Sequence, residues 1–199
     1  MSPPAAGGRE PLVVETRSAE ETRRLGAAIS PVLVPGDMIV LSGDLGAGKT
    51  TFTQGVAAGL GIVEQVTSAT FILMKEYSGG RFPLMHLDIY RLEKIQELID
   101  LGYDEFLDPS YVVIVEWGDV VEPLLPKEHL LVELRHTGDP VETDRLRTVS
   151  LVPKGPAWQS RMPTIQVLSE ELFSVGREAD PGYFGEFRAI DSRRPGTAN

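Results

Sequence analysis

One segment of the sequence combines glycines, a lysine and hydroxyl side chains at a spacing suited to binding phosphate. It consists of Gly43, Asp44, Leu45, Gly46, Ala47, Gly48, Lys49, Thr50 and Thr51. Glycine, four residues and then Gly-Lys-Thr is the pattern of a phosphate-binding P-loop. Backbone N–H groups of such a loop surround phosphate oxygens, and the amino end of the following helix adds partial positive charge. The segment predicts a loop that binds ATP and Mg²⁺, with a Gly-rich turn of no function as the alternative.

Lys49 and Thr50 would carry the charged part of this chemistry. The lysine of a P-loop neutralises the β and γ phosphates, and the hydroxyl that follows it ligates Mg²⁺. Ras-type GTPases recognise guanine with an Asn-Lys-x-Asp motif, but the only asparagine of this chain is Asn199. We therefore expect adenine as the base.

Phosphoryl transfer also needs a carboxylate near the magnesium, and two acids end apolar segments. Glu116 follows Val-Val-Ile-Val, and Asp88 follows Leu-Met-His-Leu. Glu116 is the better match, because a carboxylate that closes a buried strand is costly unless it is paired or metal-bound. For Asp88 an ordinary acid at a strand end is an equal alternative. Lys49, Asp88 and Glu116 are the predicted catalytic residues, and which acid contacts magnesium directly stays open.

Three other features have both a functional and a structural interpretation. The hydroxyls of the segment 67–70 could sense a γ-phosphate as a switch, or could belong to a polar turn before a strand. His86 could sense phosphate, although a strand histidine with its hydrogen bonds satisfied is favoured. Trp117, taken alone, is explained as a core residue.

The segments around these residues predict an α/β fold. Residues 12–17 and 38–41 have the apolar and β-branched composition of strands. Residues 18–30 begin with a Ser-x-x-Glu capping box and end before a proline, which favours a helix. Residues 49–60 have apolar side chains at helical spacing and predict a second helix directly after the Gly-rich loop.

The second half of the chain adds strands and one helix. Apolar periodicity over residues 92–99 indicates an amphipathic helix. Further strands are expected at 71–77, 82–88, 112–115, 129–135 and 145–152. The last two should form a hairpin at the sheet edge, and the pair 71–77 and 82–88 should be antiparallel. We predict a P-loop NTPase fold: a central mixed sheet with parallel core strands, antiparallel edge strands and flanking helices.

Composition divides the chain into three parts. Residues 1–11 are expected to be a disordered N-terminus, 12–155 a P-loop ATPase domain and 156–199 a partly disordered C-terminal extension. Trp158 would lie in a short helix at most. The stretch 176–199 has the composition of a weakly ordered tail. Its alternative role is docking a partner through aromatic residues, namely Phe173, Tyr183, Phe184 and Phe187.

Charge and residue usage exclude several classes of protein. The chain has 29 acidic and 19 basic residues, a net charge of -10, so its average field repels a nucleic acid backbone and we expect no direct binding of nucleic acid. The absence of cysteine excludes disulfides, thiolate zinc sites and a cysteine nucleophile. No apolar run approaches the ~20 residues of a membrane span. With no signal-peptide pattern at the start, we expect a cytoplasmic location and no membrane contact.

Together the motifs resemble the TsaE (YjeE) family, the ATPases of bacterial tRNA threonylcarbamoyladenosine synthesis. The resemblance covers about residues 12–152. Besides the Gly-rich loop it depends on Glu116-Trp117 and on two longer motifs in the family's order and spacing. These are Thr67-Ser68-Ala69-Thr70-Phe71 and His86-Leu87-Asp88-Ile89-Tyr90-Arg91-Leu92.

The resemblance implies roles for individual residues. Thr50 and Glu116 would hold magnesium, and Asp88 and the stretch 68–70, including Thr70 at the nucleotide, would act as sensing switches. Trp117 becomes a nucleotide-site residue. One departure is visible, because the family has Ser-Pro-Thr-Phe where this chain has Ala in place of the proline. Without the fixed φ of proline the segment should be looser.

The resemblance also implies partners, the threonylcarbamoyl transferase subunit TsaD and its companion TsaB. Weak intrinsic ATP hydrolysis would then be stimulated by these partners and would reset their complex. Two other functions stay open. The chain could be a nucleotide-dependent binding module without useful hydrolysis, or a small P-loop kinase of a metabolite, although the Arg-rich lid usual in such kinases is not evident.

Overall fold

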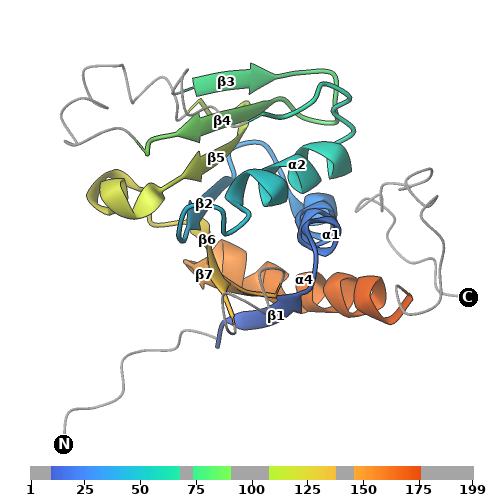
Figure 1. The fold of residues 1–199 in the computed structure, drawn as a ribbon. Coiled ribbons are helices and arrows are strands. Elements are labelled where there is room, and N and C mark those ends of the chain that lie inside the picture. Colours follow the sequence, from blue (N-terminus) through green and yellow to red (C-terminus); the bar gives the residue numbers. More distant parts are fainter. Residues whose placement is uncertain (1–9, 68–73, 91–107, 138–145, 176–199) are drawn as a thin grey trace, which may run out of the picture.

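The computed structural model describes residues 10–67, 74–90, 108–137 and 146–175 (Figure 1). They form a seven-stranded sheet in the order β1-β7-β6-β2-β5-β4-β3. The strands are β1 (Leu12–Thr16), β2 (Met38–Ser42), β3 (Met74–Tyr77), β4 (Leu84–Asp88), β5 (Val112–Glu116), β6 (His129–His136) and β7 (Arg147–Lys154). The expected α/β class with a mixed sheet is confirmed.

The centre of the sheet is parallel and its flanks are antiparallel. β2 pairs in parallel with β5 on one side and β6 on the other, and β4 pairs in parallel with β5. β3, β7 and β1 each pair antiparallel with their neighbours. All five residues of β5 and four of the five of β2 are buried, as is usual for strands covered on both faces. Because parallel strands end at the same edge, the segments after β2, β4 and β5 lie close together.

Helices cover the two faces unequally. The face that contains Ile39 and Ile114 packs against α1 (Ala19–Ile29), α2 (Lys49–Gly59) and α4 (Pro156–Val175). The opposite face, which contains Val40 and Val115, packs against the 3-10 segment η3 (Gly118–Leu124) through Val121. A shorter 3-10 turn, η1 (Ser30–Val32), follows α1. The alternation of side chains along each central strand therefore fills two separate cores.

Two glycines let α1 and α2 approach each other closely. A Cβ atom added to Gly55 would lie 1.9 Å from the carbonyl oxygen of Arg23, and one added to Gly26 would lie 2.3 Å from that of Phe52. Any larger residue at either position would push the two helices apart. Because α2 begins at Lys49, this contact helps to fix where the Gly-rich loop ends.

Most of the expected elements are present, and the boundaries that lie in the described residues differ by no more than two residues from the expected ones. The Ser18 hydroxyl accepts a hydrogen bond from the N–H of Glu21 at 3.0 Å, which confirms the predicted start of α1. α1 ends at Ile29, as the following Ser-Pro dipeptide predicted, and α2 follows the loop directly. The helix expected over 92–99 lies outside the described residues.

The expected hairpin is confirmed, but its expected place at the sheet edge is wrong. β6 and β7 do form an antiparallel hairpin, but β6 lies next to the central strand β2 and β7 is covered by β1. The N-terminal strand is therefore the edge of the sheet. The hairpin was predicted because its two strands are close in the sequence. The pairing of β1 with β7, which come from opposite ends of the domain, leaves no local sequence pattern.

The short helix expected around Trp158 is a 20-residue helix, α4. Trp158 is 1% exposed and packs in the core with Met162 and Ile165. The chain therefore continues the same packed unit beyond residue 155, and the expected boundary there does not coincide with a break in packing. Pro163 lies inside the helix, a residue that normally indicates a helix end.

Among the helices of the described ranges, none has both the length and the apolar character needed to cross a bilayer.

Candidate functional site

The Gly-rich loop connects the end of β2 to the start of α2, as its sequence pattern requires. Gly43, Gly46 and Gly48 have φ angles of 135°, 80° and 109°, a region that other residues rarely adopt. A Cβ atom at Gly43 would lie 2.0 Å from the carbonyl oxygen of Leu134 in β6. Gly43 is thus needed for its conformation and for its close contact with the neighbouring strand. Gly48 is the N-cap of α2, so the helix amino end opens directly onto the loop.

The ammonium group of Lys49 lies over the loop. Its Nζ atom donates to the carbonyl oxygens of Gly43 and Asp44 at 2.6 and 2.8 Å. The same atom lies 3.5 Å from the ring centroid of Trp117, a cation–π contact. Lys49 is 5% exposed, so its positive charge is held within the loop rather than in solvent.

The carboxylate of Glu116 is the centre of a buried hydrogen-bond network. Its Oε2 accepts from the Thr50 hydroxyl at 3.1 Å, and its Oε1 lies 3.4 Å from the Thr53 hydroxyl. The Nε2 atom of His86 is 2.9 Å from the same Oε1. Glu116 is 2% exposed, and its cost of burial is offset by these partners. The predicted pair Thr50 and Glu116 are therefore direct neighbours.

Two residues of β4 complete the polar part of the site. His86 is fully buried, and within the described part of the chain its Nδ1 atom has no hydrogen-bond partner. Asp88 lies opposite Glu116 in the parallel register of β4 and β5 and is 3% exposed. Its Oδ1 accepts from the backbone N–H of Tyr90 at 3.3 Å. The favoured interpretation of His86, a satisfied strand histidine, holds for Nε2 but not for Nδ1.

Trp117 occupies a strained turn beside the loop. It is the only described residue other than glycine with a positive φ, 66°. Its N–H donates to the carbonyl oxygen of Leu41 at 2.8 Å, which ties the turn to the end of β2. The ring lies 4.7 Å from that of Tyr90, centroid to centroid. Its ring contacts the Lys49 ammonium and lines the cleft, and it also packs against the core that contains Val40 and Val115.

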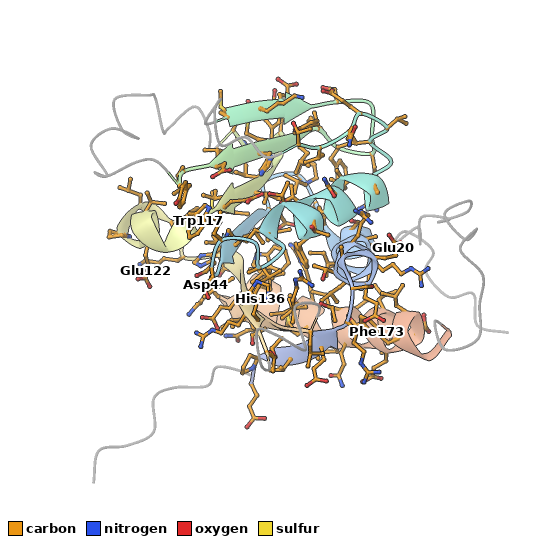
Figure 2. All side chains as sticks on the ribbon, viewed as in Figure 1. Glu20, Asp44, Trp117, Glu122, His136 and Phe173 are labelled. Atoms are coloured by element: carbon orange, nitrogen blue, oxygen red, sulfur yellow. The ribbon has the colours of Figure 1, made fainter. Side chains whose placement is uncertain are left out.

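A cleft of about 190 Å³ gathers the predicted residues at the carboxyl ends of β2, β4 and β5. Figure 2 shows Trp117 and Asp44 together at this end of the sheet, away from Phe173 of α4. The cleft is lined by Leu45, Gly46, Gly48, Lys49, Thr50, Thr51, Asp88, Tyr90, Glu116 and Trp117. Gly43, Asp44 and Ala47 shape the loop without lining the cleft. The predicted Thr70 and the rest of the 68–70 stretch lie outside the described residues.

A larger hollow of about 390 Å³ lies elsewhere, between β1, α1 and α4. Its walls combine apolar residues with scattered charges, and none of the predicted site residues lines it. We assign the functional site to the smaller cleft, because there, unlike in the larger hollow, a lysine, a hydroxyl and carboxylates converge on a Gly-rich loop.

The residues present fit an Mg²⁺ ion of the kind found beside phosphates. Mg²⁺ takes oxygen ligands and usually keeps several waters, so one or two protein oxygens suffice when phosphates supply the rest. Thr50 offers a hydroxyl, and Glu116 and Asp88 offer carboxylates around it. No cluster of three or more His, Cys, Asp or Glu able to hold a metal alone occurs in the described ranges. The donor set therefore suits a metal that arrives with its nucleotide.

Three contributors to the site were not assigned a role from the sequence. Tyr90 lines the cleft and contacts Trp117, and it is two residues beyond Asp88 in the motif already noted. Thr53 contacts Glu116 from one turn further along α2 than Thr50. Arg147 of β7 donates from Nε to the carbonyl oxygen of Ala47 in the loop at 3.0 Å. Only Tyr90 carried a sequence signal, its place in a motif.

Comparison with known proteins agrees with this arrangement. A family model described as "Threonylcarbamoyl adenosine biosynthesis protein TsaE" matches residues 16–145. The tRNA threonylcarbamoyladenosine biosynthesis protein TsaE of Bacillus subtilis is 46% identical over 124 residues, 62% of this chain and 77% of that protein. The protein of the same name from Streptomyces coelicolor is 39% identical over 140 residues, 68% of this chain and 93% of that protein.

The crystal structure of YdiB from Bacillus subtilis gives the same result in three dimensions. It superposes with a TM-score of 0.63 at 36% sequence identity, covering 83% of this chain and 95% of YdiB. The family match spans the loop, Asp88, Glu116 and Trp117, so it includes the cleft described above. The chain therefore belongs to the TsaE family, the threonylcarbamoyl adenosine biosynthesis proteins.

Proposed function

We propose that this chain binds Mg·ATP in the cleft beside the Gly-rich loop and hydrolyses it as part of tRNA threonylcarbamoyladenosine biosynthesis. The observation that carries the proposal is the convergence of Lys49, Thr50 and Glu116 where the loop enters α2. Membership of the TsaE family supports the pathway. The parallel strand order around β2, with the loop between β2 and α2, supports a P-loop NTPase fold.

The loop and Lys49 would bind the phosphates. The glycines have the positive φ angles of a loop whose backbone N–H groups can converge on an anion, and the amino end of α2 adds partial positive charge. Lys49 now shares its protons between two loop carbonyls and the face of Trp117. A phosphate in the cleft would be a stronger acceptor than a neutral carbonyl, since hydrogen bonds between charged groups are the stronger ones.

Thr50, Glu116 and Asp88 would hold the magnesium and its water shell. Bound Mg²⁺ would neutralise charge on the phosphate oxygens during hydrolysis. The Thr50 hydroxyl is already aligned by its hydrogen bond to Glu116. Asp88 and Glu116 end adjacent parallel strands, so either carboxylate can orient a water molecule at the same end of the cleft.

The partners we propose are TsaB and TsaD, the proteins implied by the sequence resemblance. ATP binding would favour docking on that pair, and hydrolysis would release it, because a ligand can shift a conformational equilibrium only through its different affinity for the two states. The exposed rim of the cleft suits such a role. Leu45 at the loop tip is 75% exposed and Tyr90 is 48% exposed.

The experiment that tests the proposal is ATP hydrolysis by the purified chain, alone and with a TsaB–TsaD pair and tRNA. We expect slow turnover alone, strong stimulation by the pair, and formation of threonylcarbamoyladenosine only when all components and ATP are present. ATP binding without hydrolysis in any mixture would instead indicate a nucleotide-dependent binding module. Transfer of phosphate to a metabolite rather than to water would indicate a kinase.

A further inference from the structure

The loop is held from behind by an arginine from a distant part of the chain. Arg147, the first residue of β7, donates from Nε to the carbonyl oxygen of Ala47 at 3.0 Å. Ala47 is fully buried, so this carbonyl depends on protein partners for its hydrogen bonds. In the sheet Arg147 pairs with Thr16 of β1 and His136 of β6. The guanidinium thus links the loop to a strand that is paired on both sides.

The same contact sets the direction of an N–H group in the loop. The Ala47 carbonyl and the Gly48 N–H belong to one planar trans peptide, in which the two groups point in opposite directions. With the carbonyl turned toward Arg147, the Gly48 N–H is turned away from it. Gly48 lines the cleft, and a Cβ added to it would lie 3.4 Å from Nε of Arg147. Arg147 therefore lies on the side of Gly48 where a side chain would otherwise be.

We propose that Arg147 is a positioning residue for the phosphate site, because it orients the Ala47–Gly48 peptide so that its N–H is available to a bound phosphate. This inference rests on the proposed binding of ATP. The family model matches residues 16–145, and Arg147 lies two residues beyond that range. A phosphate anion is the ligand chemistry that such an N–H serves.

Two substitutions separate the hydrogen bond from the charge of the guanidinium. In Arg147→Gln the amide nitrogen occupies the place of Nε along the side chain, so a donor to Ala47 is kept and the charge is lost. In Arg147→Met a methyl group occupies that place, so both are lost while the side chain keeps the length of glutamine. Arg135→Met is the matched control, since Arg135 lies on the adjacent strand β6 with a side chain that is 73% exposed.

The test is equilibrium binding of Mg·ATP and, by competition, of adenosine, to the full-length chain and the three variants. We expect Arg147→Met to weaken ATP binding about tenfold or more, which corresponds to about 1.4 kcal/mol. Adenosine binding should not change, since adenosine has no phosphate. Arg147→Gln should stay within about threefold of the wild type, as should Arg135→Met.

Three results would overturn the inference while leaving the proposed function intact. The first is that Arg147→Met binds ATP as tightly as the wild type. The second is that the Gln and Met variants lose the same amount of ATP affinity. The third is that Arg147→Met loses as much affinity for adenosine as for ATP. The second would assign the effect to charge, and the third to general distortion of the cleft. If the wild-type chain itself binds no ATP, the proposed function fails first. Thermal unfolding of each variant without nucleotide shows whether it is folded.

Discussion

The Nε2 atom of His86 lies 2.9 Å from Oε1 of Glu116, and both side chains are buried. Where this carboxylate is ionised it can only accept hydrogen bonds, and His86 is then the donor through Nε2. Glu116 is therefore held from β4 by His86 and from α2 by Thr50 and Thr53. This fixes the carboxylate in one orientation beside the Thr50 hydroxyl.

Replacing His86 tests this arrangement. His86→Leu should leave Glu116 buried with one partner fewer, at a cost of about 1–3 kcal/mol in the free energy of unfolding. His86→Gln keeps a donor in the place of Nε2, so its free energy of unfolding should decrease less. The concentration of Mg²⁺ that gives half-maximal ATP turnover should also rise in the Leu variant. Urea unfolding and a magnesium titration check both effects. Equal behaviour of the Leu and Gln variants would show that the hydrogen bond is unimportant.

Neutralising the two carboxylates should separate their roles. Because the Thr50 hydroxyl donates to Glu116, whereas Asp88 accepts from the backbone N–H of Tyr90, Glu116→Gln should raise the magnesium requirement more than Asp88→Asn. Each variant should lower turnover by about 10²-fold or more, the size of effect typical for removing a charge-stabilising group. Turnover measured over a range of Mg²⁺ concentrations decides this. A larger increase in the magnesium requirement in Asp88→Asn would show that Asp88, not Glu116, is the more important carboxylate for magnesium.

The C-terminal helix should be needed for stability. Trp158 is 1% exposed in the core formed with α1 and α2, so Trp158→Ala should cost about 3–5 kcal/mol in the free energy of unfolding. Val167→Ala on the same helix is the control, because that side chain is 52% exposed and should cost little. Chemical denaturation measures both. Similar losses in the two variants would mean that α4 does not pack as described.

Burial of His129 should make stability depend on pH. Burial lowers the pKa of His129 below its usual value, and the Lys154 charge lowers it further, while the contact of Nδ1 with the Pro126 carbonyl opposes this. As pH falls below 6.5, the unfolded chain takes up a proton before the folded chain does, so stability should decrease. Well above that pH the histidine is neutral in both the folded and the unfolded chain, so its contribution to the free energy of unfolding is fully present.

His129→Asn provides the comparison, because asparagine places a donor near the position of Nδ1 but does not titrate. The difference in free energy of unfolding between wild type and variant should change across the weakly acidic range and be constant above it. Denaturation at a series of pH values from about 5 to 8 measures this difference. A difference that does not vary with pH would refute the assignment to His129.

Residues whose roles follow from local pattern were the ones predicted from the sequence. Lys49 and Thr50 belong to a contiguous motif, and Glu116 and Asp88 each end an apolar strand. In the structure the two acids lie opposite each other, because β4 and β5 are parallel and end at one edge. The helix around Trp158 was underestimated, although Trp158, Met162, Ile165 and Ser169 are buried at helical spacing.

Contacts between distant segments could not be predicted in this way. Arg147 and Ala47 are 100 residues apart in sequence, and nothing near Arg147 forms a motif with the loop. The position of β1 at the sheet edge depends on its pairing with β7, which is set by the whole fold. Such relationships come from tertiary packing, which outweighs local propensity.

The central claim is that Lys49 and the loop bind the phosphates of ATP, and calorimetric titration of Mg·ATP tests it most directly. Lys49→Ala should weaken binding by several kcal/mol, about 10²-fold or more, because a buried positive charge at the phosphates is lost. Lys75→Ala is the control, since Lys75 pairs with Glu64 away from the cleft. Undiminished ATP affinity in Lys49→Ala would contradict the account, whereas a loss confined to Lys49→Ala would support it.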